Sequence, residues 1–432
     1  MLSRIGRARP QVRTARPAAT PVALSALAAV MTAAAVTAAA LTAAPAIAAP
    51  HGGSPSPWPS ASPSPGASPS HPGSPSPSAS GSPSPSTSGS PSTGAPGEGF
   101  LDLTPRGGES RAVRLAPGGA LVGNWAPVPD GTFTGFVRLP SGVLRALGPL
   151  GPHAQALNDQ GDAVGCTAGG TGLYWHDGTL TYLVRPGLSS CLYAINDAGQ
   201  IAGASAAPGG GEKAFVWKDG VYTDLETAPG QASTPIAINE RGQVLARVFG
   251  DRTSIPVRAV VWTDGSPTDL GTLGGAQTIP AALGTDGAVV GISEVPGGGS
   301  HPFRWAHGRM TDLLAGTGVD DRNAQAAGLD TAGDVVGTVS SRPALWRNGE
   351  LTYLADAGEA TAINEAGQVT GVVREGPDGR PTVFRWTDGD LARLPNPADA
   401  SYCYAVGIDR TGTVVGNVAV GPVGHAVVWP SA

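Results

Sequence analysis

Short apolar runs alternate with short polar turns from Ala194 to Leu225. The apolar runs contain β-branched and aromatic residues, and Gly, Asn and Asp separate them, a pattern typical of short β-strands joined by tight turns. The pattern predicts four strands, over 194–196, 200–204, 214–217 and 221–225.

Two kinds of turn separate these strands. In the segment from Asn196 to Gly199, an Asx side chain is expected to cap its own backbone while the glycine takes a positive φ angle. Asp219-Gly220 lies between two β-prone runs and favours a two-residue hairpin. Because Phe215, Val216 and Trp217 are apolar at consecutive positions, we expect this sheet to be buried on both faces.

The whole pattern recurs along the chain from residue 99 to the C-terminus. The motif apolar-x-x-x-Gly-x-x-x-Gly, with an alanine as its last residue in one copy, begins eight modules, at Leu115, Leu157, Ile195, Ile238, Leu283, Leu329, Ile363 and Ile408. A triplet, apolar in five copies and Phe-Arg-Trp in two, ends in tryptophan in seven of them, at Trp175, Trp217, Trp262, Trp305, Trp346, Trp386 and Trp429. Four-stranded units of about 42 residues are the signature of propeller blades. We therefore predict an all-β fold, a closed β-propeller of eight four-stranded blades.

The two ends of the repeat region indicate how the ring closes. The eighth module stops at Trp429 to Ala432 without a fourth strand, whereas 99–104 matches the fourth strand of other modules. The N-terminal strand is therefore expected to complete the last blade. The alternative is an open β-solenoid with ragged ends, which would need a capping repeat at each end.

Three segments carry a family resemblance: His425 to Trp429, Ala214 to Trp217 and Thr268 to Gly275. They resemble the bacterial extracellular HAF-repeat family, which takes its name from a recurring His-Ala-Phe. The resemblance covers 99–432 and implies an exported repeat protein, with no reaction attached. The chain departs from the family pattern at Arg138 and Ala246, and it has the histidine only at His301 and His425.

Composition divides the chain before the repeats into two parts. Residues 1–48 join an arginine-rich start to an apolar, alanine-rich run and the small-x-small motif Ala46-Ile47-Ala48, which predicts an export signal peptide. An uncleaved membrane anchor is the competing interpretation. Residues 49–98 are rich in Pro and Ser, so we expect a disordered linker or stalk, open to glycosylation. Residues 99–432 form the propeller, and the protein is expected to be secreted or associated with the cell surface.

Charge and motifs narrow the functional classes. The net charge is −6, or about −11 without the five arginines of residues 1–20 (−6 − 5), and no Lys/Arg cluster follows that segment, which disfavours nucleic acids and anionic membranes as partners. The sequence has no zinc-protease, serine-hydrolase or phosphate-loop motif, so we assign no catalytic residue, metal or cofactor. A propeller enzyme can still assemble its site from single residues on different loops.

Candidate binding residues lie where the connections between strands vary in length. Trp125, off the repeat register in a long loop, is expected either to stack on a sugar or partner or to pack beneath the loop. Asp320 and Asp321 are consistent with a cation site or with a solvated turn. The expected position of the other candidates near the mouth of the central channel suits either burial or ligand contact. These candidates are Tyr193, Tyr402 and Tyr404.

The chain has three cysteines, so if two of them pair in a disulfide, as is usual in exported proteins, one cysteine stays unpaired. Cys166 and Cys191 fall on the same side of neighbouring modules, and we predict that they form a disulfide worth about 3 kcal/mol. Cys403 is left free or used between chains of a protein that is otherwise expected to be a monomer.

These features favour an extracellular binding module whose variable loops recognise a carbohydrate or a surface protein. Two alternatives stay open: a propeller hydrolase or lyase acting on polysaccharide, and a purely structural envelope protein. Exposed aromatic side chains on the variable side would favour sugar binding, and converging carboxylates would favour an enzyme.

Overall fold

A computed structural model describes residues 99–431, except 105–107, 128–132, 149–153, 168, 186, 208–210, 251–255, 376–378 and 398. The expected signal peptide and linker therefore lie outside the described residues. The regular structure of the described part is all β-strand. No helix in this part has the length and apolar character needed to cross a membrane.

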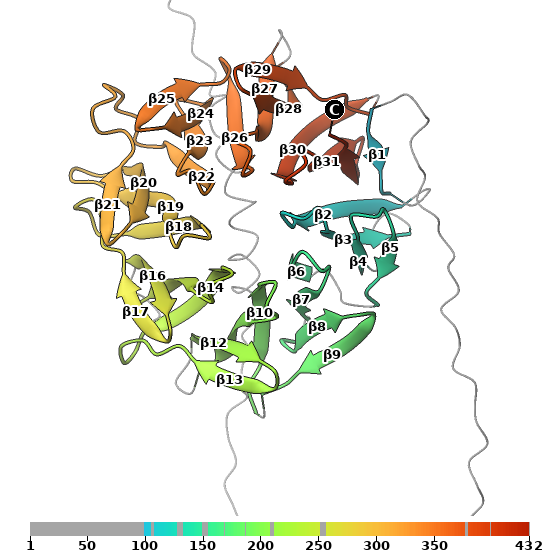
Figure 1. The fold of residues 1–432 in the computed structure, drawn as a ribbon, viewed down its shortest axis with the longest axis vertical. Coiled ribbons are helices and arrows are strands. Elements are labelled where there is room, and N and C mark those ends of the chain that lie inside the picture. Colours follow the sequence, from blue (N-terminus) through green and yellow to red (C-terminus); the bar gives the residue numbers. More distant parts are fainter. Residues whose placement is uncertain are drawn as a thin grey trace, which may run out of the picture. The chain divides into compact units, whose positions relative to one another are not determined.

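The strands form eight antiparallel sheets of four, arranged as blades around a ring (Figure 1). Blade 1 contains β2 (Glu109–Leu115), β3 (Leu121–Ala126), β4 (Thr134–Arg138) and β5 (Leu144–Ala146). Blade 2 contains β6 (Ala154–Leu157), β7 (Ala163–Cys166), β8 (Gly172–His176) and β9 (Thr179–Leu183). Blade 3 contains β10 (Ser190–Ile195), β11 (Ile201–Ala206), β12 (Glu212–Lys218) and β13 (Val221–Asp224). Blade 4 contains β14 (Ala232–Ile238), β15 (Val244–Phe249), β16 (Val257–Thr263) and β17 (Ser266–Asp269).

The second half of the ring repeats this order. Blade 5 contains β18 (Thr278–Leu283), β19 (Val289–Glu294), β20 (Ser300–Ala306) and β21 (Arg309–Asp312). Blade 6 contains β22 (Gln325–Leu329), β23 (Val335–Val339), β24 (Arg342–Arg347) and β25 (Glu350–Tyr353). Blade 7 contains β26 (Gly358–Ile363), β27 (Val369–Glu375), β28 (Arg380–Thr387) and β29 (Asp390–Arg393). Blade 8 contains β30 (Ala400–Ile408), β31 (Val414–Val420), β32 (Val423–Trp429) and the N-terminal strand β1 (Leu101–Asp102).

Strand β1 closes the ring, as the sequence predicted. It pairs antiparallel with β32, and Asp102 lies opposite Val427. The backbone N–H of Leu103 extends the pairing by donating to the carbonyl of Ala426 at 2.9 Å. The last blade is therefore completed by the first described strand of the chain, and the open-solenoid interpretation is wrong.

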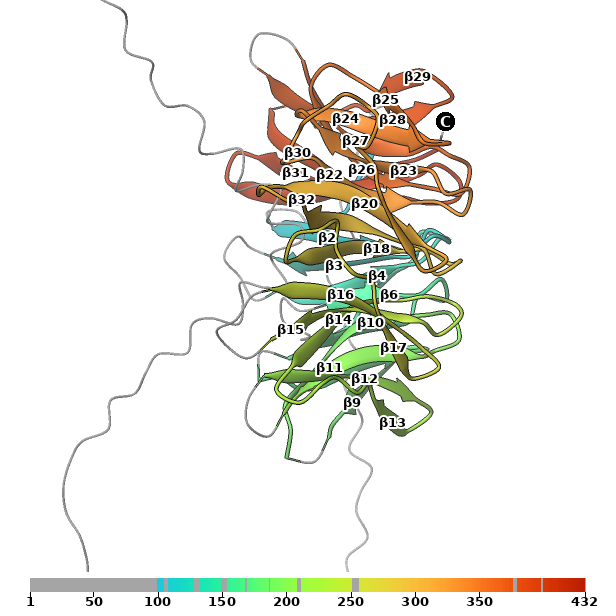
Figure 2. The same cartoon turned by 90° about the vertical axis from the view of Figure 1, so that its left-hand side faces the viewer.

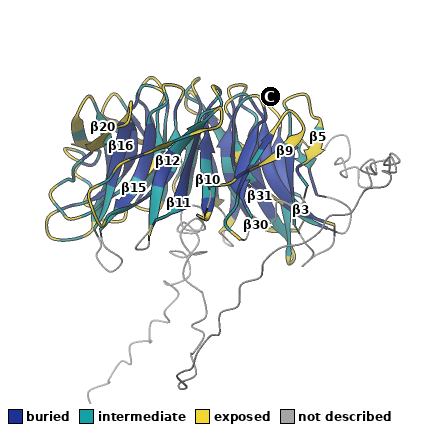
Figure 3. Ribbon diagram, turned by 90° about the horizontal axis from the view of Figure 1, so that it is seen from below, coloured by how far each residue is buried: buried dark blue, intermediate teal, exposed yellow. Residues whose placement is uncertain are grey.

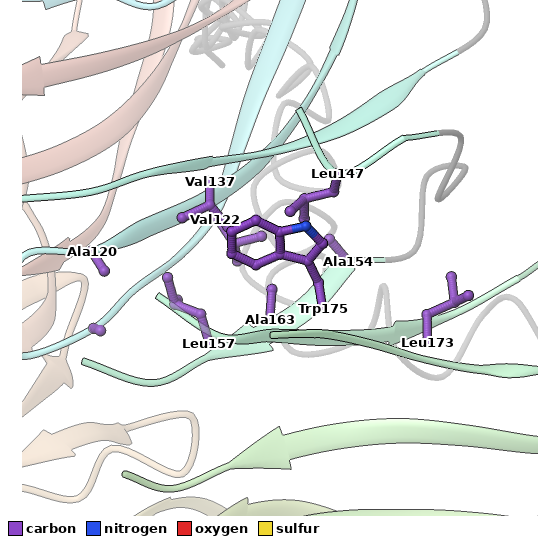
Figure 4. Packing of buried hydrophobic residues seen from close by; sticks show 10 residues of the cluster. Ala120, Val122, Val137, Leu147, Ala154, Leu157, Ala163, Leu173 and Trp175 are labelled. Carbon is purple, nitrogen blue, oxygen red and sulfur yellow. The ribbon is translucent and has the colours of Figure 1, made fainter. Parts of the chain in front are cut away.

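The hydrophobic core lies between the blades. In the described residues it forms eight clusters, and each cluster joins two neighbouring blades. Figure 4 shows one of them, in which Trp175 of blade 2 packs toward Val122 and Val137 of blade 1. The cluster between blades 8 and 1 contains Leu103 and Val428, so the closing interface is built like the others.

The repeated tryptophan and glycine have identifiable packing roles. Trp262 and Trp429 are almost completely buried, and the indole N–H of Trp429 donates to the carbonyl of Pro395 in the link that enters its blade. Gly416, on the neighbouring strand, leaves room for this ring: an added Cβ atom would lie 2.4 Å from the carbonyl oxygen of Tyr404 and 2.9 Å from the Trp429 ring. Any larger residue there would push the strands apart.

The two faces of the ring differ in their connections. We call one the turn face: the first and second strands of every blade are joined there by five residues. The predicted Asp-Gly hairpins lie on the same face, with Asp219 and Gly220 both at positive φ (47° and 87°). The other side, the loop face, carries connections that range from two residues between β23 and β24 to twelve between β21 and β22. Strands cross the thickness of the ring (Figure 2), and exposed residues lie at the connections and on outer strands such as β5 and β9 (Figure 3).

Candidate functional site

Hydrogen bonds between blades occupy many of the polar side chains of the turn face. Asn196 Nδ2 donates to the carbonyl of Asn239 at 3.0 Å, and Asn239 Nδ2 donates to that of Gly284 at 3.0 Å. The same bond joins Asn158 to the carbonyl of Asn196 at 3.3 Å. Asn196 also accepts from the N–H of Gln200 inside its own turn. The recurring asparagine therefore holds its turn together and links it to the next blade.

Acidic residues of the turn face have a similar role. Asp159 accepts from the N–H of Gly118 at 2.6 Å, Asp197 from that of Asp159 at 2.8 Å, and Glu240 from that of Asp197 at 3.1 Å. Burial raises the pKa of Glu240, and the charges of Asp197 and Asp159 raise it further. The described residues hold no group of three or more His, Cys, Asp or Glu placed to bind a metal ion. These carboxylates join the blades, and we do not count them as a site.

The loop face presents a pair of tyrosines on the innermost strand of blade 8. Tyr402 and Tyr404 have ring centroids 5.9 Å apart, and Tyr402 is 37% exposed. Burial, followed by the charge of Glu359 and by Tyr404, raises the pKa of Tyr402, while Arg374 lowers it. Two aromatic rings, a carboxylate and a guanidinium thus come from blades 7 and 8 to the loop-face end of the innermost strands, and we call this group of four residues the channel mouth. The sequence analysis placed the two tyrosines here.

Glu359 and Arg374 were not recognised from the sequence. Glu359 is the second residue of β26, the innermost strand of blade 7. Burial raises the pKa of Glu359, and the nearby charge of Arg374 only partly offsets this effect. In the repeat register, Glu359 faces Val372 across the sheet as Thr234 faces Arg247 in blade 4 and Arg111 faces Asn124 in blade 1. Because a charged residue also stands at this position in blade 1, the repeat alone does not single out Glu359.

Tyr193 lies elsewhere on the ring, in the innermost strand of blade 3. It is the extra residue of a β-bulge between Leu192 and Ala194, and a bulge recurs in the inner strand of all eight blades. Burial and then the charge of Glu212 raise the pKa of Tyr193. Tyr193 therefore does not belong to the Tyr402–Tyr404 pair.

Trp125 requires a correction, because it lies in strand β3 and not in a loop. It pairs with Ser110 on one side and Thr134 on the other. Its ring packs against Phe136 with centroids 5.4 Å apart. The long segment after Gly123 extends the strand by three residues before the loop begins. Of the two interpretations of Trp125, packing is the one that the structure favours.

Asp320 and Asp321 lie in the twelve-residue link between β21 and β22. Asp320 pairs with Arg322 at 3.5 Å, and Asp321 accepts from the N–H groups of Asn323 and Ser340. The carboxylates therefore have partners within the loop face, which is the arrangement of a solvated turn.

The structure contains the expected disulfide between Cys166 and Cys191, with Cα atoms 5.0 Å apart. It links strand β7 of blade 2 to the innermost strand of blade 3. Cys403 is free and buried, and its thiol donates to the carbonyl of Pro381 at 3.0 Å. Burial raises the pKa of Cys403 to about 11. This position does not support the expected alternative of a bond between chains through Cys403.

Comparisons with known proteins match the fold and nothing more specific. No family model matches the sequence, and no curated protein matches it. The propeller domain of the Trilobed protease from Pyrococcus furiosus is 11% identical, with a TM-score of 0.46, over 67% of this chain and 99% of that one. A puromycin-hydrolyzing peptidase from Mycobacterium tuberculosis is 16% identical, with a TM-score of 0.45, over 72% and 57%. Dipeptidyl peptidase 4 from Porphyromonas gingivalis is 10% identical, with a TM-score of 0.48, over 70% and 56%.

The values record partial structural similarity to three solved proteins, one of which is the propeller domain of a protease. The chain spans a little more than half the length of the two peptidases. At identities of 10 to 16%, the similarity concerns the fold alone.

Proposed function

We propose that this protein is an exported, extracellular binding module of the HAF-repeat kind whose loop face recognises a surface carbohydrate. The observation that carries the proposal is the half-exposed pair Tyr402 and Tyr404 beside Glu359 and Arg374. An aromatic ring offers a flat apolar surface to the C–H face of a sugar, and a neighbouring carboxylate and guanidinium offer hydrogen bonds to its hydroxyl groups.

The contrast between the two faces supports the same proposal. Turn-face side chains such as Asn196 and Asp197 bond to neighbouring blades, whereas the loop face displays connections of unequal length on a rigid ring. Binding residues are usually carried by loops of this kind. Export is supported by the predicted signal in residues 1–48 and by the Cys166–Cys191 disulfide, a bond that persists in oxidising compartments.

A glycan array probed with the purified chain tests the proposal. Saturable binding is expected, and the Tyr402→Ala substitution is expected to weaken it about tenfold, because loss of an aromatic stacking partner costs about 1.4 kcal/mol. Tyr182→Ala is the matched control, since Tyr182 is also an exposed tyrosine (56%) but lies on the outer strand of blade 2. Absence of binding to every glycan, or equal loss in both variants, would contradict the proposal.

A further inference from the structure

A cleft opens on the loop face between the outer halves of blades 6 and 7. Its volume is about 320 Å³, the size of a small ligand site. Blade 6 contributes Arg342 and Tyr353 and the link that follows them, and blade 7 contributes Glu375, Leu391 and Arg393. The cleft does not include any of the residues at the channel mouth.

Two guanidinium–carboxylate pairs form the polar lining of this cleft. Arg342 pairs with Asp356 at 3.3 Å on the side of blade 6. Arg393 binds Glu375 through two hydrogen bonds of 2.6 and 2.7 Å on the side of blade 7. Each guanidinium group is paired with a carboxylate. The lining therefore offers both hydrogen-bond donors and hydrogen-bond acceptors and carries no net charge.

The side chain of Arg342 is fixed before any ligand arrives. Its guanidinium carbon lies 4.0 Å from the centroid of the Tyr353 ring, and its Nε donates to the carbonyl of Ala355 at 3.2 Å. Arg342 is the first residue of β24 and follows the two-residue connection Ser340-Ser341. The backbone N–H of Ser340 donates to Asp321, which holds this connection in place. A donor fixed in this way loses little conformational freedom on binding.

We propose that this cleft is a second carbohydrate subsite, which binds an uncharged sugar residue of the same glycan class as the channel mouth. The inference rests on the proposed function. A sugar ring offers hydroxyl groups at its edge to both ion pairs and a C–H face to Leu391 and the stem of Arg342. A free anion is disfavoured, because Asp356 and Glu375 already neutralise the two guanidinium groups and would repel it.

Hydrogen–deuterium exchange of the full chain tests the subsite. The probes are four neutral hexasaccharides, of the cello, xylo, chito and malto series, with inorganic phosphate as the charged comparison. At least one hexasaccharide is expected to protect the backbone of 340–356 and 379–393, and phosphate is expected to leave it unchanged. In the Glu375→Gln variant this protection is expected to fall by at least half, while protection of 400–405 stays. Glu350→Gln is the control, because Glu350 is an exposed acid of blade 6 on the turn face.

The outcomes separate the two proposals. Protection of 400–405 alone would overturn the second subsite and leave the channel mouth as the binding site. Protection by phosphate in place of the sugars would show that the cleft is an anion site. Protection of neither segment by any hexasaccharide would overturn the second subsite, and the glycan array would then decide the proposed function separately. If Glu350→Gln lost as much protection as Glu375→Gln, the conclusion that Glu375 binds the sugar in the cleft would also be contradicted.

Discussion

At the scale of single residues, the repeated asparagine does more than shape its turn. Asn196 bonds to Gln200 within the turn through its oxygen, and to the carbonyl of Asn239 in the next blade through its nitrogen. It is also almost fully buried, at 1% exposure. Removing this side chain leaves the N–H of Gln200 without its acceptor, and it leaves the carbonyl of Asn239 with the N–H of Gly242 as its remaining donor.

The Asn196→Ala substitution is therefore expected to lower the free energy of unfolding by about 2 kcal/mol. Denaturant titration of the purified chain measures this loss. Asp264→Asn provides the comparison, because Asp264 occupies an exposed two-residue turn at positive φ (49°), which asparagine tolerates, and among the described residues it has no bond to a neighbouring blade. A loss in Asn196→Ala no larger than in Asp264→Asn would contradict the role of the asparagine between blades.

Cys403 gives a second prediction at this scale. Its thiol is 1% exposed, and burial raises its pKa to about 11, so little of it is thiolate at neutral pH. We expect no reaction with a thiol reagent in the native chain, and one reactive thiol per chain after unfolding without reductant. Rapid reaction in the native state would show that the thiol is accessible.

At the scale of elements, the strand β1 determines how the ring closes. Asp102 bonds to His425 Nδ1 at 2.8 Å and accepts from the N–H of Thr104. Burial alone would raise the pKa of Asp102, but these hydrogen bonds and the charge of His425 together hold it below its ordinary value.

This pKa makes the closure sensitive to acid. Because the folded pKa of Asp102 is below the unfolded value of about 3.9, its contribution is complete above that value and is lost as the pH falls through the folded pKa. At neutral pH, Asp102→Asn is expected to lower the free energy of unfolding by about 1 kcal/mol. The difference from the wild type should shrink below about pH 4. Unfolding measured at pH 7 and pH 3 checks this, and a difference that grows in acid would contradict it.

Much at this scale could be read from the sequence, since turn residues and tryptophans are local signals. The number and order of the strands of blade 3, the Asp219-Gly220 hairpin and the closing strand were predicted correctly, but the first strand of blade 3 begins at Ser190, four residues before its predicted start. Trp125 was misplaced because the strand continues past the closing Gly123, as the second strands of blades 3, 5 and 7 also continue past their closing glycines. The grouping of Tyr402 with Glu359 and Arg374 depends on how blades 7 and 8 pack, which no single module encodes.

At the scale of the whole molecule, the core lies between blades, so each blade depends on both neighbours. All eight interfaces of the described ring have their own buried cluster, and the closing interface includes Leu103 from the N-terminal side. Such a ring gives a rigid support in which the turn face can hold the blades together while the loop face is free to vary. Our account therefore assigns binding to the loop face, while the turn face serves to join the blades.

The dissociation constant of the array-selected glycan, measured for Asn196→Ala and Tyr402→Ala at a temperature where both are folded, tests this division most directly. We predict that Asn196→Ala binds within about twofold of the wild type, and that Tyr402→Ala binds about tenfold more weakly. Retained binding in Tyr402→Ala together with lost binding in Asn196→Ala would contradict the account.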